Sequence, residues 1–514
     1  MIPAPPIPVI PTADPTPQAG PRPRSGRLAL ALLTAVAVVA ASAAVGVATA
    51  PDRIRSPTAW DPRVRDLVAF VESARGLSFK RPVPVYFLSP AEYRRASAGG
   101  DPATPTASDR RDAKREAGQL RALGLVEGDV DLIGAGREVA DSGTLAFYSP
   151  DEKVVNVRGT KMSVSLRVTL AHELTHALQD QNLNLRLDGL TSEQYTAARA
   201  VIEGDAVATE DAYVAQLGHD DQQAYDKEST QASSDSKSEL DQADVPDVMS
   251  TLFGLPYALG RWFVGVIDAR SGSDSPDLSR IDPVFARMPR TTAEVFNPLT
   301  YLDHVRVATV TAPPVVGPAG VSSARFHGTE FSGTDRDGEV LGAGFLFVML
   351  SERIDAATAM QVVDGWRGDA YRAAEGRSRD GKPVVCVSAR IRQKDDSSGA
   401  SLRAALEDWA TALPSEAGAS VAGSGKDATF RTCDPGVGVK TGLPDRAGDA
   451  LIYPVARDQI AAGQIQGGAT PATALCIGTA VVSELTLAEL QSDEASDELS
   501  RKVDGLFSAA SASC

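Results

Sequence analysis

Residues 164–181 read VSLRVTLAHELTHALQDQ, and this stretch decides how the rest of the chain is interpreted. Its apolar residues recur at helical spacing, so it is predicted to form one helix with an apolar face. His172 and His176 are four residues apart, which on a helix places their imidazoles one above the other on the same side. With Glu173 between them they form the pattern HExxH, in which two histidines hold one metal ion and the glutamate lies beside it.

Zinc is the ion that suits this pattern. It accepts neutral imidazole nitrogen and carboxylate oxygen in tetrahedral geometry and leaves one position for water, whose pKa falls to roughly 7. We therefore expect one zinc ion, with Glu173 as the catalytic base. The alternative is a surface helix that carries two histidines by chance. Against it, the whole chain has only five histidines, and two of them have this spacing.

A third protein ligand is expected from a second helix, predicted for residues 191–217, which begins with a capping box of Thr191 and Gln194. Glu203 is the best candidate because Val201 and Ile202 before it place it in an apolar setting, where an unpaired carboxylate is costly. Gly204 after it lowers helix propensity, which indicates a close approach of backbone or ligand. The alternative is that Glu203 is an exposed glutamate with no ligand role.

Two aspartates are candidates to orient the histidines by accepting a hydrogen bond from the ring nitrogen that does not bind the metal. Asp180 continues the row of His172 and His176 by one helical turn, and Asp205 follows Glu203 by two residues. Carboxylates in such positions accept the second N–H of a metal-bound imidazole. The alternative for Asp180 is an ordinary residue near a helix end.

The HExxH helix, followed by a second helix with Glu-Gly-x-Ala at residues 203–206, resembles the gluzincin group of zinc metallopeptidases. Further stretches are similar to a poorly characterised family of membrane-anchored peptidases of this type, so the resemblance covers roughly residues 60 to 410. These stretches are HALQDQ at 176–181, Pro256 and Tyr257 with Gly260, TAE at 292–294 with Asn297, Pro298 and Tyr301, and GWRGD at 365–369. Asn297 stands where the family pattern leads us to expect a histidine.

The resemblance implies a peptide or protein substrate, with Glu173 taking a proton from water and delivering it to the leaving amine. A further donor stabilises the oxyanion in such enzymes and contributes about 3–4 kcal/mol. The sequence offers four candidates for this donor and does not choose among them: Tyr213, Tyr257, Tyr301 and His304. The alternative function is a catalytically inactive zincin-like scaffold that binds peptides or envelope partners. An intact Glu173 favours catalysis.

The expected fold class is α+β. We expect a zincin-like, mainly helical catalytic domain with a small edge sheet, followed by a C-terminal α/β and disulfide-bearing region. Residues 144–157 have the alternating pattern of a β-hairpin with a turn at 149–151, directly before the HExxH helix. A sheet edge beside that helix would bind an extended peptide by strand addition.

At 514 residues the chain can hold two or three packed units. We predict seven segments, in chain order a proline-rich cytoplasmic tail (1–27), a transmembrane anchor (28–50), a zincin catalytic lobe (57–218), an acidic serine-rich loop (219–246), a helical second lobe (247–375), a small α/β element (376–440) and a C-terminal tail with cysteines (441–514).

The prediction of an anchor rests on residues 28–50, which contain no charged residue. A helix of this length spans a bilayer core of about 30 Å. Arg22, Arg24 and Arg27 precede it, so the N-terminus is expected in the cytoplasm and the catalytic region outside, in a single-pass membrane protein. The alternative is secretion after cleavage near Ala50, where Ala48-Thr49-Ala50 fits a signal-peptidase site.

The four cysteines all lie in the C-terminal region, which predicts two disulfides. Four cysteines allow three pairings. Of these we favour Cys386 with Cys433 and Cys476 with Cys514, because residues 384–391 and 428–433 have the pattern of neighbouring strands.

The net charge of −16 argues against nucleic acid as a partner. A glycine-rich stretch at 422–426 ends in lysine, but Asp427 stands where a phosphate-binding loop needs Ser or Thr, so no nucleotide is expected.

Overall fold

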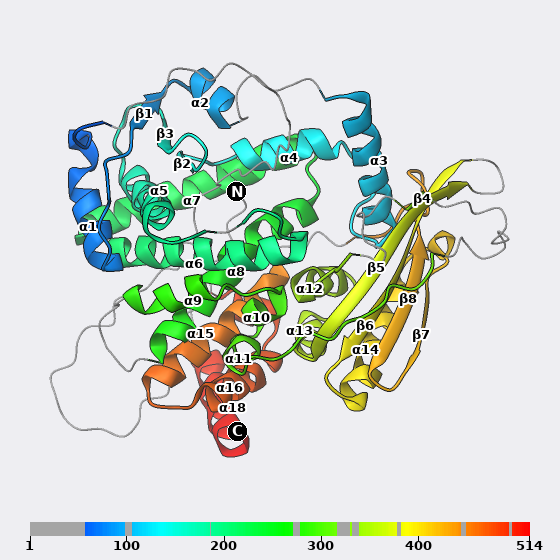
Figure 1. The fold of residues 1–514 in the computed structure, drawn as a ribbon. Helices are drawn as coiled ribbons and strands as arrows, with labels where there is room; N and C mark the ends of the chain where they lie inside the picture. The colour runs from blue at the N-terminus through cyan, green and yellow to red at the C-terminus, as the bar shows by residue number, and fades with distance from the viewer. Residues whose placement is uncertain are drawn as a thin grey trace.

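The computed structural model of the chain describes residues 57–97, 105–185, 187–270, 278–315, 329–330, 339–377, 382–443, 449–492 and 496–514. These residues are mainly helical and contain two small sheets, which lie apart from each other with helices between them (Figure 1). The predicted α+β class is therefore confirmed.

A three-stranded sheet lies beside the HExxH helix. It consists of β1 (Val85–Leu88), β2 (Ala146–Ser149) and β3 (Val154–Arg158) in the order β1-β3-β2. β2 and β3 form the predicted antiparallel hairpin, and β1 joins the other side of β3 in parallel. Val155 and Val157 of β3 share a hydrophobic core with Leu170 and Leu174 of the helix, which fixes the sheet against that helix. The helices that precede α5 in the chain are η1 (Pro62–Val64), α1 (Arg65–Arg75), α2 (Pro90–Ser97), α3 (Ala107–Ala122) and α4 (Leu132–Asp141).

The two predicted ligand helices are α5 (Val164–Asn182) and α6 (Ser192–Ala215), and they pack against each other. α5 begins at Ser163, whose hydroxyl accepts the N–H of Leu166. α6 begins with the capping box predicted from Thr191 and Gln194.

α6 also packs closely against α8 (Asp247–Ala269), at two glycines. A Cβ on Gly204 would lie 2.2 Å from the carbonyl oxygen of Gly260, and a Cβ on Gly260 would lie 1.9 Å from that of Ala200. Both distances are shorter than any Cβ contact allows, so only glycine permits this crossing. The close approach expected from Gly204 is confirmed, with backbone as the neighbour.

The segment 219–246 was predicted to be a loop, and this is wrong. It forms α7 (His219–Gln242), which packs against α4 and α5. The buried side chains of α7 recur every three or four residues: Tyr225, Ser229, Ser233, Ser236 and Leu240. Three of the five are serines. The inner face of this helix is therefore small and polar, and a search for apolar periodicity misses it.

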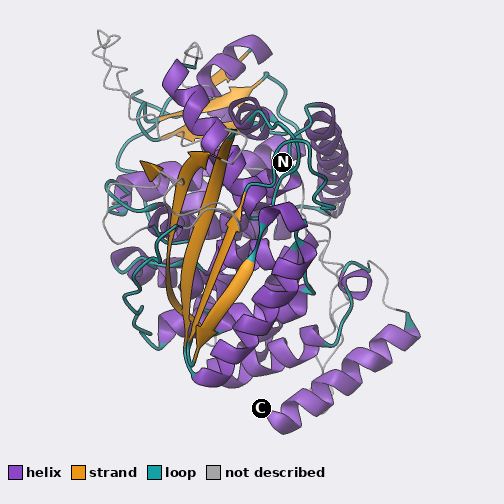
Figure 2. Ribbon diagram, turned by 90° about the vertical axis from the view of Figure 1, so that its right-hand side faces the viewer, coloured by secondary structure: helices purple, strands orange, loops and turns teal. Residues whose placement is uncertain are grey.

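The second sheet has five antiparallel strands, seen face-on in Figure 2. The strands are β4 (Thr329–Glu330), β5 (Trp366–Arg377), β6 (Pro383–Gln393), β7 (Ser420–Ser424) and β8 (Asp427–Cys433), in the order β4-β5-β6-β8-β7. α14 (Asp396–Ala412) packs against it, with Trp409 edge-on to Phe430 at 5.1 Å between ring centroids. β5 pairs with β6 along its length, so the sheet crosses the predicted boundary between residues 375 and 376.

The segment 441–514 is not a tail. It contains α15 (Ile452–Gln466), α16 (Pro471–Ser483), α17 (Leu487–Leu490) and α18 (Asp497–Ser513). Ile452, Val455 and Ile460 of α15 belong to the main hydrophobic core, and α15 packs against α8. The remaining elements are η2 (Leu278–Ile281), α9 (Asp282–Ala286), α10 (Thr292–Phe296), α11 (Pro298–Leu302), α12 (Ala343–Ser351), α13 (Ala356–Asp364), η3 (Ser415–Ala417) and η4 (Asp449–Leu451).

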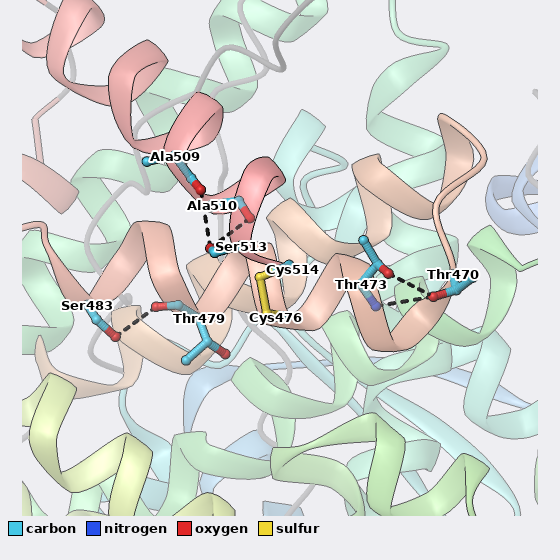
Figure 3. Close-up of a disulfide and its surroundings, with 9 residues drawn as sticks. All are labelled: Thr470, Thr473, Cys476, Thr479, Ser483, Ala509, Ala510, Ser513 and Cys514. Atoms are coloured by element: carbon cyan, nitrogen blue, oxygen red, sulfur yellow. Dashed lines mark hydrogen bonds between the residues drawn. A yellow bond between two sulfur atoms is a disulfide. The ribbon is translucent and has the colours of Figure 1, made fainter.

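Both predicted disulfides are present. Cys386 of β6 lies opposite Cys433 of β8 and is bonded to it. Cys476 of α16 is bonded to Cys514 at the end of α18, as Figure 3 shows. The second bond fixes the C-terminal helix to the helical core.

The prediction of a single-pass membrane protein does not stand. Among the residues that the structure describes, no helix is both long enough and apolar enough to cross a bilayer. α8, with 23 residues, is interrupted by the charges of Asp247, Arg261 and Asp268. The segments for which the tail and the anchor were predicted, 1–27 and 28–50, lie outside the described residues, as does the predicted cleavage site near Ala50.

Candidate metal centre

α5 and α6 bring three ligand atoms together in the interior. The Nε2 atoms of His172 and His176 lie 3.0 Å apart. Glu203 Oε2, from α6, lies 3.4 Å from Nε2 of His172 and 3.3 Å from Nε2 of His176. In the described part of the chain, these three residues are the one group of three or more His, Cys, Asp or Glu ligand atoms that all lie within 4.8 Å of one another.

This triangle fits a small metal ion. Ligands about 2.0–2.2 Å from a tetrahedral zinc ion are about 3.3 Å from one another, which is close to the three distances found. Glu203 Oε2 is buried and has no hydrogen-bond partner among the described residues. Such an oxygen is costly unless it is paired or coordinates a metal. The buried group of His172, His176 and Glu203 could therefore bind a metal ion.

Hydrogen bonds at Nδ1 of His172 and His176 leave the Nε2 atom of each ring available to a metal ion. Nδ1 of His172 lies 3.2 Å from Glu210 Oε2, and Nδ1 of His176 lies 3.0 Å from Gln179 Oε1. With its proton on Nδ1, each imidazole donates to that oxygen and turns the lone pair of Nε2 toward Glu203. Neither partner was expected from the sequence. Glu210 follows Glu203 by seven residues, two helical turns along the same face of α6, and this spacing was the available signal.

Asp205 acts on His176 through Gln179 and makes no direct contact with the ring. The amide nitrogen of Gln179 donates to Asp205 Oδ2 at 2.8 Å and to the carbonyl oxygen of Ile202 at 3.0 Å. These two bonds fix the amide so that its oxygen faces His176. Asp205 is itself paired with the buried Arg75 of α1 at 2.8 Å, which joins the ligand helix to the rest of the lobe.

The role predicted for Asp180 is wrong. Its carboxylate accepts hydrogen bonds from the hydroxyl of Tyr148 at 2.6 Å and from Nζ of Lys153 at 2.9 Å. Both partners belong to the hairpin region. Asp180 therefore fastens the end of α5 to β2, and the imidazoles are held by Glu210 and Gln179 instead.

The second oxygen of Glu203 is held by a cation. Nε of Arg199, one turn earlier on α6, donates to Glu203 Oε1 at 3.1 Å. Nη2 of the same guanidinium donates to the hydroxyl of Tyr257 at 2.9 Å. The ring of Tyr257 stacks beside that of His172 at 6.4 Å between centroids. Arg199 thus fixes one oxygen of the carboxylate and leaves the other facing the imidazoles.

Glu173 lies beside the triangle with one oxygen fixed and one available. Oε2 accepts the backbone N–H of Tyr148 in β2 at 2.7 Å. Oε1 is buried and, within the described ranges, has no hydrogen-bond partner. Burial raises the pKa of Glu173 to about 8. A divalent ion held by the neighbouring imidazoles would lower that pKa again, because it favours the charged form of the carboxyl.

The pKa shifts of the three ligand residues show that the cluster favours a positive charge. Burial lowers the pKa of His172 to about 4. Burial also opposes a proton on His176, but the charge of Glu203 outweighs it and raises the pKa of His176 to about 9. Burial alone would raise the pKa of Glu203, yet His176, His172 and Arg199 together lower it. The cluster therefore favours one positive charge, which a proton on His176 supplies. A metal ion can take the place of that proton.

Of the four residues considered for the oxyanion, the structure places Tyr257 at the site. Tyr213 packs edge-on to Phe70 in the core beneath the small sheet. Tyr301 donates to the carbonyl oxygen of Arg287 at 3.0 Å and packs against Phe263. His304 is exposed after α11. The structure brings none of these three to the ligand atoms.

Comparisons with protein-family models, with curated proteins and with solved structures find no match for this chain. The geometry of the site is therefore the basis for any functional conclusion.

Proposed function

We propose that this protein is a zinc-dependent peptidase of the gluzincin type, in which His172, His176 and Glu203 hold the ion. The observation that carries the proposal is the convergence of three ligand atoms next to the unpartnered oxygen of Glu173. A scaffold that only binds metal has no need of a buried carboxylate beside the ligands, and burying one is costly.

In this proposal Glu173 is the general base and later the general acid. Its Oε2 is fixed by the N–H of Tyr148, so Oε1 is the atom that takes a proton from the attacking water and passes it to the leaving amine. A zinc ion at the site would supply a Lewis acid for the scissile carbonyl and lower the pKa of water to about 7. Glu210 and Gln179 keep the imidazoles in the tautomer that the ion requires.

We propose that Tyr257 and Arg199 face the oxyanion. Nε of the guanidinium donates to Glu203, Nη2 donates to the Tyr257 hydroxyl, and the ring of Tyr257 lies beside that of His172. Recognition of an extended peptide at β2 stays a prediction.

A catalytically inactive scaffold that contains the same ion is the second candidate. It is favoured by the burial of the site, since His172 and Glu173 are fully buried and His176 is 7 % exposed. In that case the ion would stabilise the packing of α5 against α6.

A substitution of Glu173 separates the two candidates. Zinc-loaded protein is expected to cleave a quenched-fluorescence peptide library, and Glu173→Gln should lower the rate by about 10²–10⁴-fold while one zinc per chain remains bound. Glu138→Gln, in an exposed position on α4, is the control and should keep full activity. Zinc binding without cleavage by the native protein would support the inactive scaffold.

A further inference from the structure

A pocket of about 270 Å³ lies at the N-terminal end of α8. It is formed by the turn after α3, by the junction between α7 and α8, by the end of α12 and by Leu443. The lining combines apolar walls with four carboxylates, and among the described residues that line it there is no basic side chain: Leu125, Val126, Glu127, Val130, Asp244, Val245, Pro246, Asp247, Val248, Glu352 and Leu443.

Glu352 is the residue that marks this pocket as a binding site. Glu352 is one of the lining residues, although it is only 4 % exposed. Its Oε1 is buried and, in the part of the chain that the structure covers, makes no hydrogen bond. Burial raises the pKa of Glu352 to about 7; the charge of Arg353 opposes this shift, and the charge of Asp247 adds to it. A buried carboxylate oxygen without a donor is costly, and a cation from outside would offset that cost.

The charge of Arg353 acts on Glu352, but the hydrogen bonds of the cations near the pocket go to other groups. Arg353 donates through Nη1 to the carbonyl oxygen of Thr441 at 2.7 Å and through Nη2 to that of Gly124 at 2.8 Å. Lys440 is 92 % exposed and pairs with Glu127 Oε1 at 2.7 Å, on the solvent side. Neither of them makes a hydrogen bond to Glu352 among those found in the described residues.

The size and lining of the pocket decide which kind of cation fits. His172, His176 and Glu203 are the described residues that bring three ligand atoms within 4.8 Å, so the carboxylates of this pocket are too widely spaced to surround a bare ion. The volume is also several times that of one water, whose share of liquid volume is about 30 Å³. An arginine side chain has an aliphatic stem for the apolar walls and five N–H donors for separated carboxylates.

We propose that this pocket binds the side chain of an arginine from a peptide or protein partner, with its guanidinium on Glu352 and its stem against the apolar wall. Asp247 and Tyr257 are ten residues apart on α8, so the pocket lies about 15 Å along this helix from the metal centre. The proposal does not rest on the proposed peptidase function.

Binding of N-acetyl-arginine amide, measured by calorimetry, tests the proposal. The native protein should bind it saturably, and the neutral isostere N-acetyl-citrulline amide should bind at least tenfold more weakly. Glu352→Gln should raise the dissociation constant at least tenfold. Because this change removes a buried charge and keeps the shape of the side chain, the variant is expected to fold.

Three further measurements make the test decisive. Asp244→Asn removes a carboxylate at the rim and keeps the backbone, since Asn tolerates the φ of 54° found there; it should weaken binding by less than Glu352→Gln does. Glu407→Gln, exposed on α14, should leave binding unchanged. His176→Ala should also leave it unchanged, which separates this site from the metal centre. Equal binding of the two amides, an unaltered dissociation constant in Glu352→Gln, or calcium binding at Glu352 without arginine binding would overturn the proposal.

Discussion

Arg457 on α15 and His172 on α5 each lie at the centre of a buried polar cluster, but the two clusters obtain their positive charge differently. Nε of Arg457 donates to Asp458 at 2.7 Å, Nη1 donates to Asp364 at 2.9 Å, and Nη2 donates to the carbonyl oxygen of Phe296. The guanidinium supplies the charge permanently. At the metal centre the three ligand atoms face one another instead, and Nε of Arg199 donates to Glu203 Oε1, the oxygen that faces away from the imidazoles.

The difference shows how a structural cluster is distinguished from a binding site. Both are buried, and both contain groups with shifted pKa values, so burial and titration do not separate them. What separates them is the position of the chain's own cation: Arg457 contacts both carboxylates of its cluster, whereas Arg199 contacts Glu203 at the oxygen that faces away from the imidazoles. In the α15 cluster each guanidinium nitrogen of Arg457 has a partner, although Asp458 Oδ2 has none among the described residues. At the metal centre Glu203 Oε2 and Glu173 Oε1 remain without one among the described residues.

The largest effect is expected from breaking the α15 cluster. Arg457→Met would leave the buried carboxylate of Asp458 without its counter-charge, and removing one partner of a buried pair costs about 3–5 kcal/mol. Urea unfolding should show this loss, and zinc affinity of the folded variant should stay within twofold of the native value. The control is Arg501→Met, exposed on α18. If Arg457→Met were as stable as this control, the cluster would have no structural role.

A smaller effect is expected from the partner of His172. Glu210→Ala removes the acceptor at Nδ1, and loss of such a partner lowers metal affinity by about 10–100-fold. Asp180→Asn, the residue wrongly expected in this role, should leave zinc affinity unchanged because it contacts Tyr148 and Lys153. Zinc titration of both variants, with folding checked by circular dichroism, measures the contrast. A larger loss in Asp180→Asn would reverse our assignment.

The last effect depends on pH and concerns Glu193, a buried acid outside the metal centre. Its Oε1 accepts from the backbone N–H and the hydroxyl of Thr292, and burial raises its pKa from 4.5 to about 8. The folded state therefore binds this proton more tightly than the unfolded state. The resulting stability is complete below about pH 4.5 and is lost as the pH rises through 8, by at most about 1.4 kcal/mol per pH unit.

Glu193→Gln should remove this contribution. The free energy of unfolding, measured in urea at pH 6 and pH 8.5, should fall less with pH in the variant than in the native protein. Parallel changes in the two proteins would show that Glu193 does not titrate as described.

The local elements that position the site could be predicted from the sequence. The HExxH spacing, the capping box at Thr191 and the hairpin before α5 are short-range patterns, and each is found as predicted. Glu203 could be selected because a carboxylate in an apolar helix segment needs a partner. The disulfides followed from the strand pattern and from the even number of cysteines.

The contacts between elements could not be predicted in the same way. Asp180 and Glu210 are both acidic and both near a ligand in sequence, but only the rotation of α6 against α5 decides which of them reaches an imidazole. The serine-rich sequence of α7 is typical of a loop, and only the packing of its serines against α4 and α5 explains why it is a helix. Tyr213 and Tyr257 are also equivalent in the sequence, and the glycine crossing of α6 and α8 is the feature that places Tyr257 beside His172.

The most direct test of the metal centre is anomalous diffraction at the zinc edge from crystals grown with zinc. We expect one strong anomalous peak per chain, about 2.0–2.2 Å from Nε2 of His172, Nε2 of His176 and Oε2 of Glu203. An empty triangle in zinc-soaked crystals, or a peak held by other residues, would contradict it.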